Sequence, residues 1–386
     1  MATDEAVTGE NERRAAGWLA AWDAQGTHRT GTAGDRAGAD WLAREAAALG
    51  AEVAVETFVF EQLDPALVCL EIAGERIPGV PVFDAPPSGL DGIEGRIGSE
   101  IALAELSPRA VYSGEFERLR RAPGHLALVV VCAGEAPGLA LINAEKFTAP
   151  YGAPALHVSS EARERVLAAA RTGSRARLVS FSRRTPARAA NIVATLKGRT
   201  PGRSPLVVMT PRSSWWQSTA ERGGGLVCWL ESLRALVAAA GTAALARDVV
   251  FTANTGHELG HTGLDDFIAR RAGWDRPGGA EWVHYGANLG AAGSWLSLVS
   301  NAEDLRALGL AALSRAGQPP DDIPWPAQPP SGETRDIHRA GGRYLTLVGS
   351  NRLFHLPQDR WPHAVDVPAI ARIAAAAARM VPALAR

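Results

Sequence analysis

The sequence predicts an α/β fold, with a mostly parallel or mixed central sheet, helices on both faces and an inserted β-rich domain. Three observations support this prediction. Strand and helix patterns alternate from about residue 186 onward, as in a parallel sheet covered on both faces. A helix pattern, a glycine and an alternating strand open the chain. Between these parts, short strand-like runs are separated by Gly- and Pro-rich connections. We therefore predict an insert at 63–185 between the two parts of the main domain, 1–62 and 186–386.

The composition excludes several classes of function. The 386 residues carry 40 Lys and Arg against 41 Asp and Glu, so no basic footprint for nucleic acid or anionic lipid is present. Cys69, Cys132 and Cys228 form neither a disulfide framework nor a zinc motif. No run reaches the ~18 apolar residues of a membrane span. We expect a soluble, cytoplasmic protein that acts on a small molecule or short peptide, and a homo-oligomer is left open.

Two helices and a strand are predicted at the start of the chain. Apolar positions recur at helical spacing over 10–24 and again over Asp35–Leu49, where Gly50 is placed as a C-cap. The alternating run AEVAVETFVF that follows is typical of a strand.

The predicted insert contains short strands and one helix. Strand-like runs are Leu67–Ala73, Ile101–Leu106 and Leu126–Cys132, and the helix is Ser160–Ala170. This module is expected to carry no chemistry and to shape access to a site elsewhere.

The second half alternates strands and helices. The Pro-rich stretch 318–332 is predicted to be an ordered surface loop near the site. The predicted elements are the strands Ala190–Gly198, Pro205–Met209, Val249–Ala253, Val283–Leu289 and Tyr344–Val348 and the helices Leu226–Ala240 and Val367–Leu384.

A polar cluster with His257, Glu258 and His261 follows the strand at Val249–Ala253, and ligands bind at the carboxyl ends of strands in open α/β sheets. The letters HELGH also fit H-E-x-x-H, in which two histidines one helical turn apart bind zinc. That motif needs a continuous helix, whereas three glycines flank or interrupt this one. We therefore favour a strand-turn-helix arrangement, with His261 behind the site or at the helix entry.

Several collinear segments resemble the di-zinc aminopeptidase family, whose relatives include glutaminyl cyclases and the transferrin receptor ectodomain. These segments are HRTGTAGDRAGADWLAREAAALGAEVAVETFVF, NIVATLKG, PLVVM, FTANTGHELGHTGLDDF and FHLPQD. Within the insert, GAPALHVSSEARERVLAAARTG resembles the last strand and helix of a protease-associated domain.

The resemblance implies an incomplete metal site. The family's bridging aspartate falls on Glu221, its base and ligand glutamates fall on His257 and Glu258, and one histidine ligand falls on His355. The other ligand positions fall on Pro211, Ser213 and the vicinity of Gly286, none of which offers a plausible ligand.

On this resemblance, one zinc ion is expected on Glu221, Glu258 and His355, with His257 as general base, and the catalytic residues are His257, Glu258 and Glu221. The expected reaction is hydrolysis of an amide or related C–N bond. A metal-free enzyme and an inactive protein that binds a ligand or partner are the alternatives.

Further residues are expected to line the substrate pocket. In one alternative, a serine of the 213–214 pair is a nucleophile activated by His257. His338, with Glu333 and Asp336 nearby, is placed on the substrate-side loop. The predicted substrate-binding residues are Arg212, Ser213, Ser214, Trp215, Trp216, Arg222, His284, Asn351 and Arg352.

Overall fold

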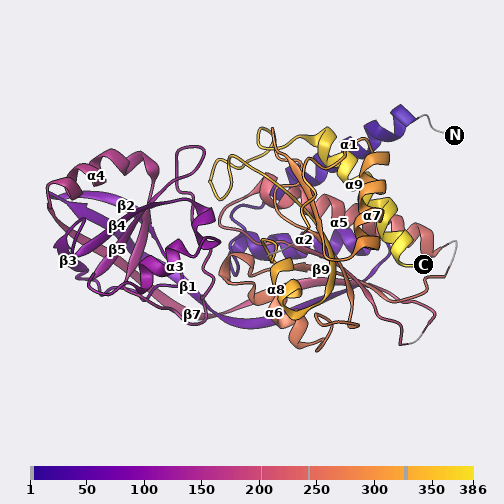
Figure 1. Ribbon diagram of the computed structural model, residues 1–386, viewed down its shortest axis with the longest axis horizontal. Coiled ribbons are helices and arrows are strands. Elements are labelled where there is room, and N and C mark those ends of the chain that lie inside the picture. Colours follow the sequence, from indigo (N-terminus) through magenta and orange to yellow (C-terminus); the bar gives the residue numbers. More distant parts are fainter. Residues whose placement is uncertain (1–3, 201, 242–243, 326–328) are drawn as a thin grey trace.

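Two long strands join the two lobes of the molecule (Figure 1). The computed structural model describes residues 4–200, 202–241, 244–325 and 329–386. Strands β1 (Glu52–Ile72) and β7 (Arg175–Leu196) pair antiparallel along almost their whole lengths, with a register shift between Pro65 and Leu67. One end of this ribbon lies in the larger lobe and the other in the smaller lobe, so both lobes share one hydrogen-bonded framework.

The strands form one mixed sheet. Its order is β11-β12-β10-β8-β9-β7-β1-β2-β6-β5-β4, and β3 pairs with β7 off this path. The larger lobe has the parallel pairs β8–β9, β8–β10 and β10–β12, as the sequence predicts. The remaining strands are β2 (Glu75–Pro81), β3 (Ile93–Arg96), β4 (Ile101–Leu106), β5 (Ala127–Cys132), β6 (Ala155–Val158), β8 (Leu206–Pro211), β9 (Val249–Asn254), β10 (Glu281–Tyr285), β11 (Leu296–Ser300) and β12 (Arg343–Gly349).

Helices cover both faces of the sheet in the larger lobe, which confirms the predicted fold class. Residues of α1, α2, α5, α7 and α9 share one buried cluster with the sheet, and residues of α6 and α8 share a second cluster on the opposite face. The smaller lobe has its own cores and two short helices. The helices are α1 (Asp4–Asp23), α2 (Ala33–Ala48), α3 (Glu115–Arg121), α4 (Arg163–Arg171), α5 (Thr219–Ala240), α6 (Thr262–Ala269), α7 (Glu303–Arg315), α8 (Thr334–Ala340) and α9 (Val367–Leu384), with short 3-10 turns η1 (Pro108–Val111), η2 (Ser160–Ala162) and η3 (His257–Leu259).

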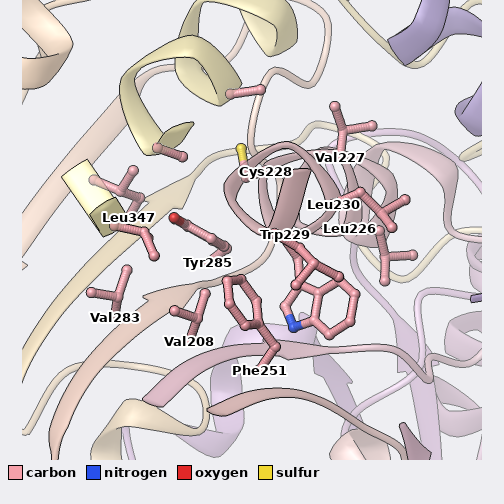
Figure 2. Close-up of a cluster of buried hydrophobic side chains, with 14 of the residues drawn as sticks. Val208, Leu226, Val227, Cys228, Trp229, Leu230, Phe251, Val283, Tyr285 and Leu347 are labelled. Atoms are coloured by element: carbon pink, nitrogen blue, oxygen red, sulfur yellow. The ribbon is translucent and has the colours of Figure 1, made fainter. Parts of the chain in front are cut away.

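Helix α5 lies at the centre of the larger core. Figure 2 shows its Trp229 beside Phe251 of β9, and the two rings meet edge to face at 5.3 Å. Aromatic pairs in this geometry gain about 1 kcal/mol beyond their buried area. Helices α5 and α9 are long and apolar enough to pass a test for membrane spans, yet 67% and 50% of those windows are buried. Both helices contribute to the same buried core cluster, so packing accounts for their apolar composition.

Helix α5 begins two turns earlier than predicted, at Thr219. The glycine run Gly223–Gly225 argued against a helix there because glycine lowers helix propensity. Tertiary contact explains the run: a Cβ on Gly224 would lie 1.9 Å from the carbonyl oxygen of Leu289, and one on Gly225 would lie 2.6 Å from Thr210 Oγ1. The close approach of neighbouring backbone therefore overrides local propensity.

Most other predicted elements are observed with shifted ends. Ile101–Leu106 and Val367–Leu384 are confirmed at their predicted bounds, whereas β11, α7 and α8 were not predicted. Of the Pro-rich stretch 318–332, residues 326–328 lie outside the described part of the chain, while Ser331 and Gly332 lie at the pocket discussed below.

The packing of α5 gives a first prediction. Gly224→Ala should destabilise the fold by about 3 kcal/mol or more, because the added methyl group overlaps the Leu289 carbonyl. The measurement is urea unfolding followed by circular dichroism. Gly17→Ala, in the exposed middle of α1 with nothing near the new Cβ, is the control and should gain up to about 1 kcal/mol. Equal stability of both variants would contradict the packing explanation.

Candidate active site

A pocket opens at the carboxyl edge of the parallel strands. It contains about 630 Å³ of empty space, part of it open to solvent, and it is lined by Pro211 at the end of β8, Gly286 just after β10 and Gly349 at the end of β12. Arg109 and Tyr112 of the smaller lobe line its other side. Ligands bind at this edge in open α/β sheets, so the pocket is the candidate site.

The segment after β9 is a strand-turn-helix, as predicted. The 3-10 turn η3 spans only His257–Leu259, and both Gly260 and His261 adopt left-handed backbone conformations before α6 begins. This break excludes the continuous helix that an H-E-x-x-H zinc site requires. The rings of His257 and His261 nevertheless stack, with centroids 4.9 Å apart.

Glu258 is fully buried and both its oxygens accept hydrogen bonds from protein groups. Oε1 accepts from the backbone N–H and the hydroxyl of Thr30, each at 2.7 Å, and Oε2 accepts from the Ser213 hydroxyl at 2.6 Å. We call this set the Glu258 network. A buried carboxylate is stable only when it is paired or hydrogen-bonded, and here hydroxyl groups supply those bonds.

Glu221 is paired with its neighbour in the helix. Its Oε1 lies 2.7 Å from the guanidinium of Arg222, and its Oε2 accepts from the Ser214 hydroxyl at 2.7 Å. Burial alone would raise the pKa of Glu221, but the charges of Arg222 and His355 and the Ser214 hydrogen bond outweigh it and lower the pKa to about 2. Glu221 is therefore a stable anion whose partner is Arg222.

His355 approaches the same carboxylate from the opposite side. Its Nδ1 donates to the Leu141 carbonyl of the smaller lobe at 2.6 Å, which leaves Nε2 3.3 Å from Glu221 Oε1 without a hydrogen bond. The ring orientation fits a metal ligand. The neighbouring Arg222 does not fit one, because a zinc ion bound here would lie next to a buried guanidinium.

The three expected zinc ligands therefore do not fit a metal as they stand. Both oxygens of Glu258 accept hydrogen bonds in the Glu258 network, and Glu221 is neutralised by Arg222. His355 Nε2 and Glu221 Oε1, 3.3 Å apart, are the ligand atoms of the three residues that make no hydrogen bond within the described chain. No group of three His, Cys, Asp or Glu residues arranged to hold a metal occurs in the described parts of the chain. We accordingly derive no chemical step through a metal.

His257 is paired with Glu333, a residue that sequence reasoning did not include in the site. His257 Nδ1 lies 3.5 Å from Glu333 Oε1, and Asn254 donates to the other oxygen at 3.1 Å. Burial raises the pKa of Glu333 to about 7. Burial and then the charge of Arg222 lower the pKa of His257 well below its ordinary value. The one sequence signal for Glu333 was its nearness to the substrate-side loop.

Two further polar residues lie on the pocket wall with unpaired atoms. His284, 2% exposed, contacts the hydroxyls of Thr334 and Thr346 through Nδ1, and its Nε2 has no partner among the described residues. Asn288, 4% exposed, donates to the Gly349 carbonyl, and its Oδ1 is likewise unpaired within the described chain. Burial, followed by the charges of His261 and Arg222, lowers the pKa of His284 to about 3, so the ring is neutral.

Both serines of the 213–214 pair donate to carboxylates, Ser213 to Glu258 and Ser214 to Glu221. Neither hydroxyl donates to His257; instead Ser213 Oγ accepts from the His257 backbone N–H at 3.1 Å. Their contacts are structural, and we do not assign a nucleophile to either serine.

Other predicted substrate-binding residues face away from the pocket. Arg212 is buried against Asp35, with a 2.8 Å ion pair, and donates to the Ala190 carbonyl. The indole of Trp215 donates to Asn143 of the smaller lobe, and that of Trp216 donates to the His355 carbonyl. The Trp215 contact joins the two lobes, and none of the three residues lines the pocket.

The last two predicted residues also lie outside the pocket lining. Asn351 donates to Asp359, which accepts from the first turn of α5, and Arg352 is exposed. Both residues lie near His355 in the sequence because they belong to the 351–359 segment, which contacts the first turn of α5 through Asp359.

The fold of this chain matches solved structures, although no family model or curated protein matches its sequence. A zinc aminopeptidase from Bacillus subtilis superimposes with a TM-score of 0.74 at 16% identity, over 95% of this chain and 94% of that one. A peptidase M28 precursor from Shewanella amazonensis gives 0.73 at 14%, over 98% and 96%. An aminopeptidase from Aneurinibacillus gives 0.71 at 16%, over 98% and 94%.

The chain has the fold of the zinc aminopeptidases. The coverage is nearly complete in both directions, so the aminopeptidase-like fold accounts for both lobes. At such identities the match establishes the fold, and the chemistry has to be argued from the site.

The contacts that engage Glu221 and Glu258 predict that the protein does not need a metal ion. Protein purified without added zinc should contain well below one equivalent, and dialysis against a chelator should leave its melting temperature unchanged, because bound metal would stabilise the folded state by mass action. The measurements are elemental analysis and calorimetry, with zinc added back in excess as the control. Retention of one equivalent, removable only with loss of stability, would contradict this prediction.

The pair of His261 with Asp336 predicts a pH-dependent contribution to stability. Nδ1 of His261 lies 2.5 Å from Asp336 Oδ2; burial acts to lower the pKa of His261, but the hydrogen bond and charge of Asp336 outweigh it and the net shift is upward. The pair should therefore stabilise fully below the ordinary histidine pKa of 6.5. Its contribution should be lost as the pH rises through the raised value.

The variant for this test is His261→Asn, because asparagine tolerates the left-handed backbone at this position. Its loss of unfolding free energy should be about 1 kcal/mol near pH 5.5, after discounting for solvent screening, and should shrink above pH 7. Asp336→Asn removes the other partner of the pair and should show the same trend. A loss that grows with rising pH would contradict the assignment.

Proposed function

We propose that the protein is a hydrolase that cleaves an amide or related C–N bond in a small molecule or short peptide without a metal ion. The observation that carries this proposal is the buried His257–Glu333 pair at the wall of the pocket. A histidine oriented by a carboxylate is a general base. Two solved structures with the same fold are aminopeptidases, from Aneurinibacillus and Bacillus subtilis, and this supports the reaction class.

In this proposal His257 is the general base. Its Nδ1 lies 3.5 Å from Glu333 Oε1, a distance at which neither atom makes a hydrogen bond within the described residues, and its ring lines the pocket. Nε2 takes a proton from water while the water oxygen attacks the carbonyl carbon, and it then gives that proton to the nitrogen as the C–N bond breaks. The products are a carboxylic acid and an amine. Burial raises the pKa of Glu333 to about 7 and lowers the pKa of His257 well below its ordinary value.

Arg222 is a buried cation outside the pocket lining, paired with Glu221. Its Nε donates to the Ser213 carbonyl at 2.7 Å, while Nη1 and Nη2 make no hydrogen bond among the described residues beyond the ion pair with Glu221. The charge acts on the pKa values of His257, His284 and Glu333.

An inactive ligand-binding protein is the second candidate. It is favoured by the contacts of Glu221 and Glu258, which are held by neighbouring side chains as structural groups are. Release of amine from a bound amide distinguishes the two functions.

The test is the release of amine from a panel of N-acyl amino acids, dipeptides and amino acid amides, measured in chelator. His257→Ala should lower kcat by about 10²- to 10⁴-fold, the usual contribution of a general base. His363→Ala, an exposed histidine elsewhere, is the control and should keep full activity. Turnover that survives in His257→Ala would contradict the mechanism, and binding without turnover across the panel would favour the second candidate.

The same pair predicts the pH profile. Because burial raises the pKa of Glu333 to about 7, kcat should fall as the pH drops through about 7 and the carboxylate becomes protonated. Glu333→Gln should lower kcat by at least about 10-fold and remove this acidic limb. An unchanged limb in Glu333→Gln would assign it to another group.

A further inference from the structure

The formal charge on the described pocket lining is positive and comes from Arg109. Arg109 of η1 is exposed and lines the pocket, and its side chain makes no ion pair or hydrogen bond within the described residues. No Asp or Glu occurs among the described lining residues. Three carboxylates outside the lining, Glu145, Glu221 and Glu333, are paired with Arg335, Arg222 and His257. A ligand ammonium group would therefore meet a cation and no free carboxylate, whereas a ligand carboxylate would meet an available guanidinium.

The rim of the pocket is aromatic. Tyr112 is 46% exposed and Trp295 is 43% exposed, and both line the opening. Phe354 lines it as well and stacks on His355 with ring centroids 3.8 Å apart. Exposed aromatic rings beside a pocket are suited to hold an apolar or aromatic group of a ligand.

The wall offers polar partners for an amide. Asn288 Oδ1 is a buried acceptor that lacks a donor, and His284 Nε2 is a buried ring nitrogen that lacks a partner within the described chain. A buried polar atom left unpaired costs about 1–3 kcal/mol, so a ligand that pairs it gains affinity. An amide N–H matches Asn288 Oδ1.

We propose that the pocket binds N-acylated amino acids, with the free carboxylate on Arg109, the amide N–H on Asn288 and the apolar group against Tyr112 and Trp295. This inference rests on the proposed hydrolase function and gives its substrate class: an amide that bears an anion and no free amino group. Arg109 is then a specificity-determining residue, supplied by the smaller lobe to a site built on the larger one. A guanidinium binds a carboxylate through two parallel hydrogen bonds, which favours orientation as well as affinity.

The test is calorimetric binding of three probes that differ only at their ends. N-acetyl-L-phenylalanine carries the carboxylate, N-acetyl-L-phenylalaninamide replaces it with a neutral amide, and L-phenylalaninamide adds an ammonium group. We expect the first to bind at least about 10-fold more tightly than the second, because one charge-assisted pair is worth 1.5–3 kcal/mol in general. The third should bind most weakly.

Arg109→Gln should weaken N-acetyl-L-phenylalanine by about 10-fold and leave N-acetyl-L-phenylalaninamide within about twofold. Arg118→Gln, an exposed arginine of the same lobe outside the pocket, is the matched control and should change neither. Trp295→Ala should weaken both probes alike. Circular dichroism of each variant checks its folding, and in turnover Arg109→Gln should raise KM with little change in kcat.

The outcomes separate this inference from the proposed function. Arg109-dependent binding without hydrolysis would sustain the inference and reject the hydrolase. Hydrolysis of ammonium-bearing amides that is indifferent to Arg109→Gln would sustain the hydrolase and overturn the inference. Absence of binding by all three probes would overturn the inference as well.

Discussion

The requirement that every buried charge has a partner determines the arrangement of this site. Glu258 is completely buried, and the Glu258 network satisfies it with hydroxyl and backbone groups from Thr30 and Ser213. Removing such partners would leave a carboxylate in a medium of low dielectric constant, which is strongly unfavourable. The network also joins the N-terminal loop, the end of β8 and η3, three segments far apart in the sequence. The carboxylate that resemblance assigns to a metal thus holds the fold together at the edge of the sheet.

The partnership of Arg222 with Glu221 has consequences for the neighbouring histidines. A buried guanidinium beside them favours their neutral forms, and burial acts in the same direction. Glu333 responds oppositely to burial, which raises its pKa to about 7. Perturbed pKa values of this kind cluster at functional sites.

The smaller lobe participates in the site by two routes. Behind the pocket, the Ala144 backbone N–H donates to the Glu258 carbonyl, Leu141 accepts from His355, and Asn143 accepts from Trp215. In front, Arg109 and Tyr112 line the opening. The expectation that this module only shapes access is therefore incomplete, because its backbone orients His355 and its side chains contribute to the lining. The long β1–β7 ribbon joins the smaller lobe, which makes both sets of contacts, to the larger lobe.

The sequence by itself determined the local elements and the fold class. Hydrophobic periodicity located the strands at 249–253 and 344–348 and the terminal helix Val367–Leu384, and the glycines around His257 excluded a zinc-binding helix. It did not reveal Glu333, Asn288 or Thr30, because their roles depend on contacts between residues distant in the chain. Nor did it show that Arg222 pairs with Glu221 and that Arg212 turns to Asp35. Periodicity is a local property of the sequence. The pairing of buried charges depends on the tertiary packing, which brings together groups that are distant in the chain and removes them from water.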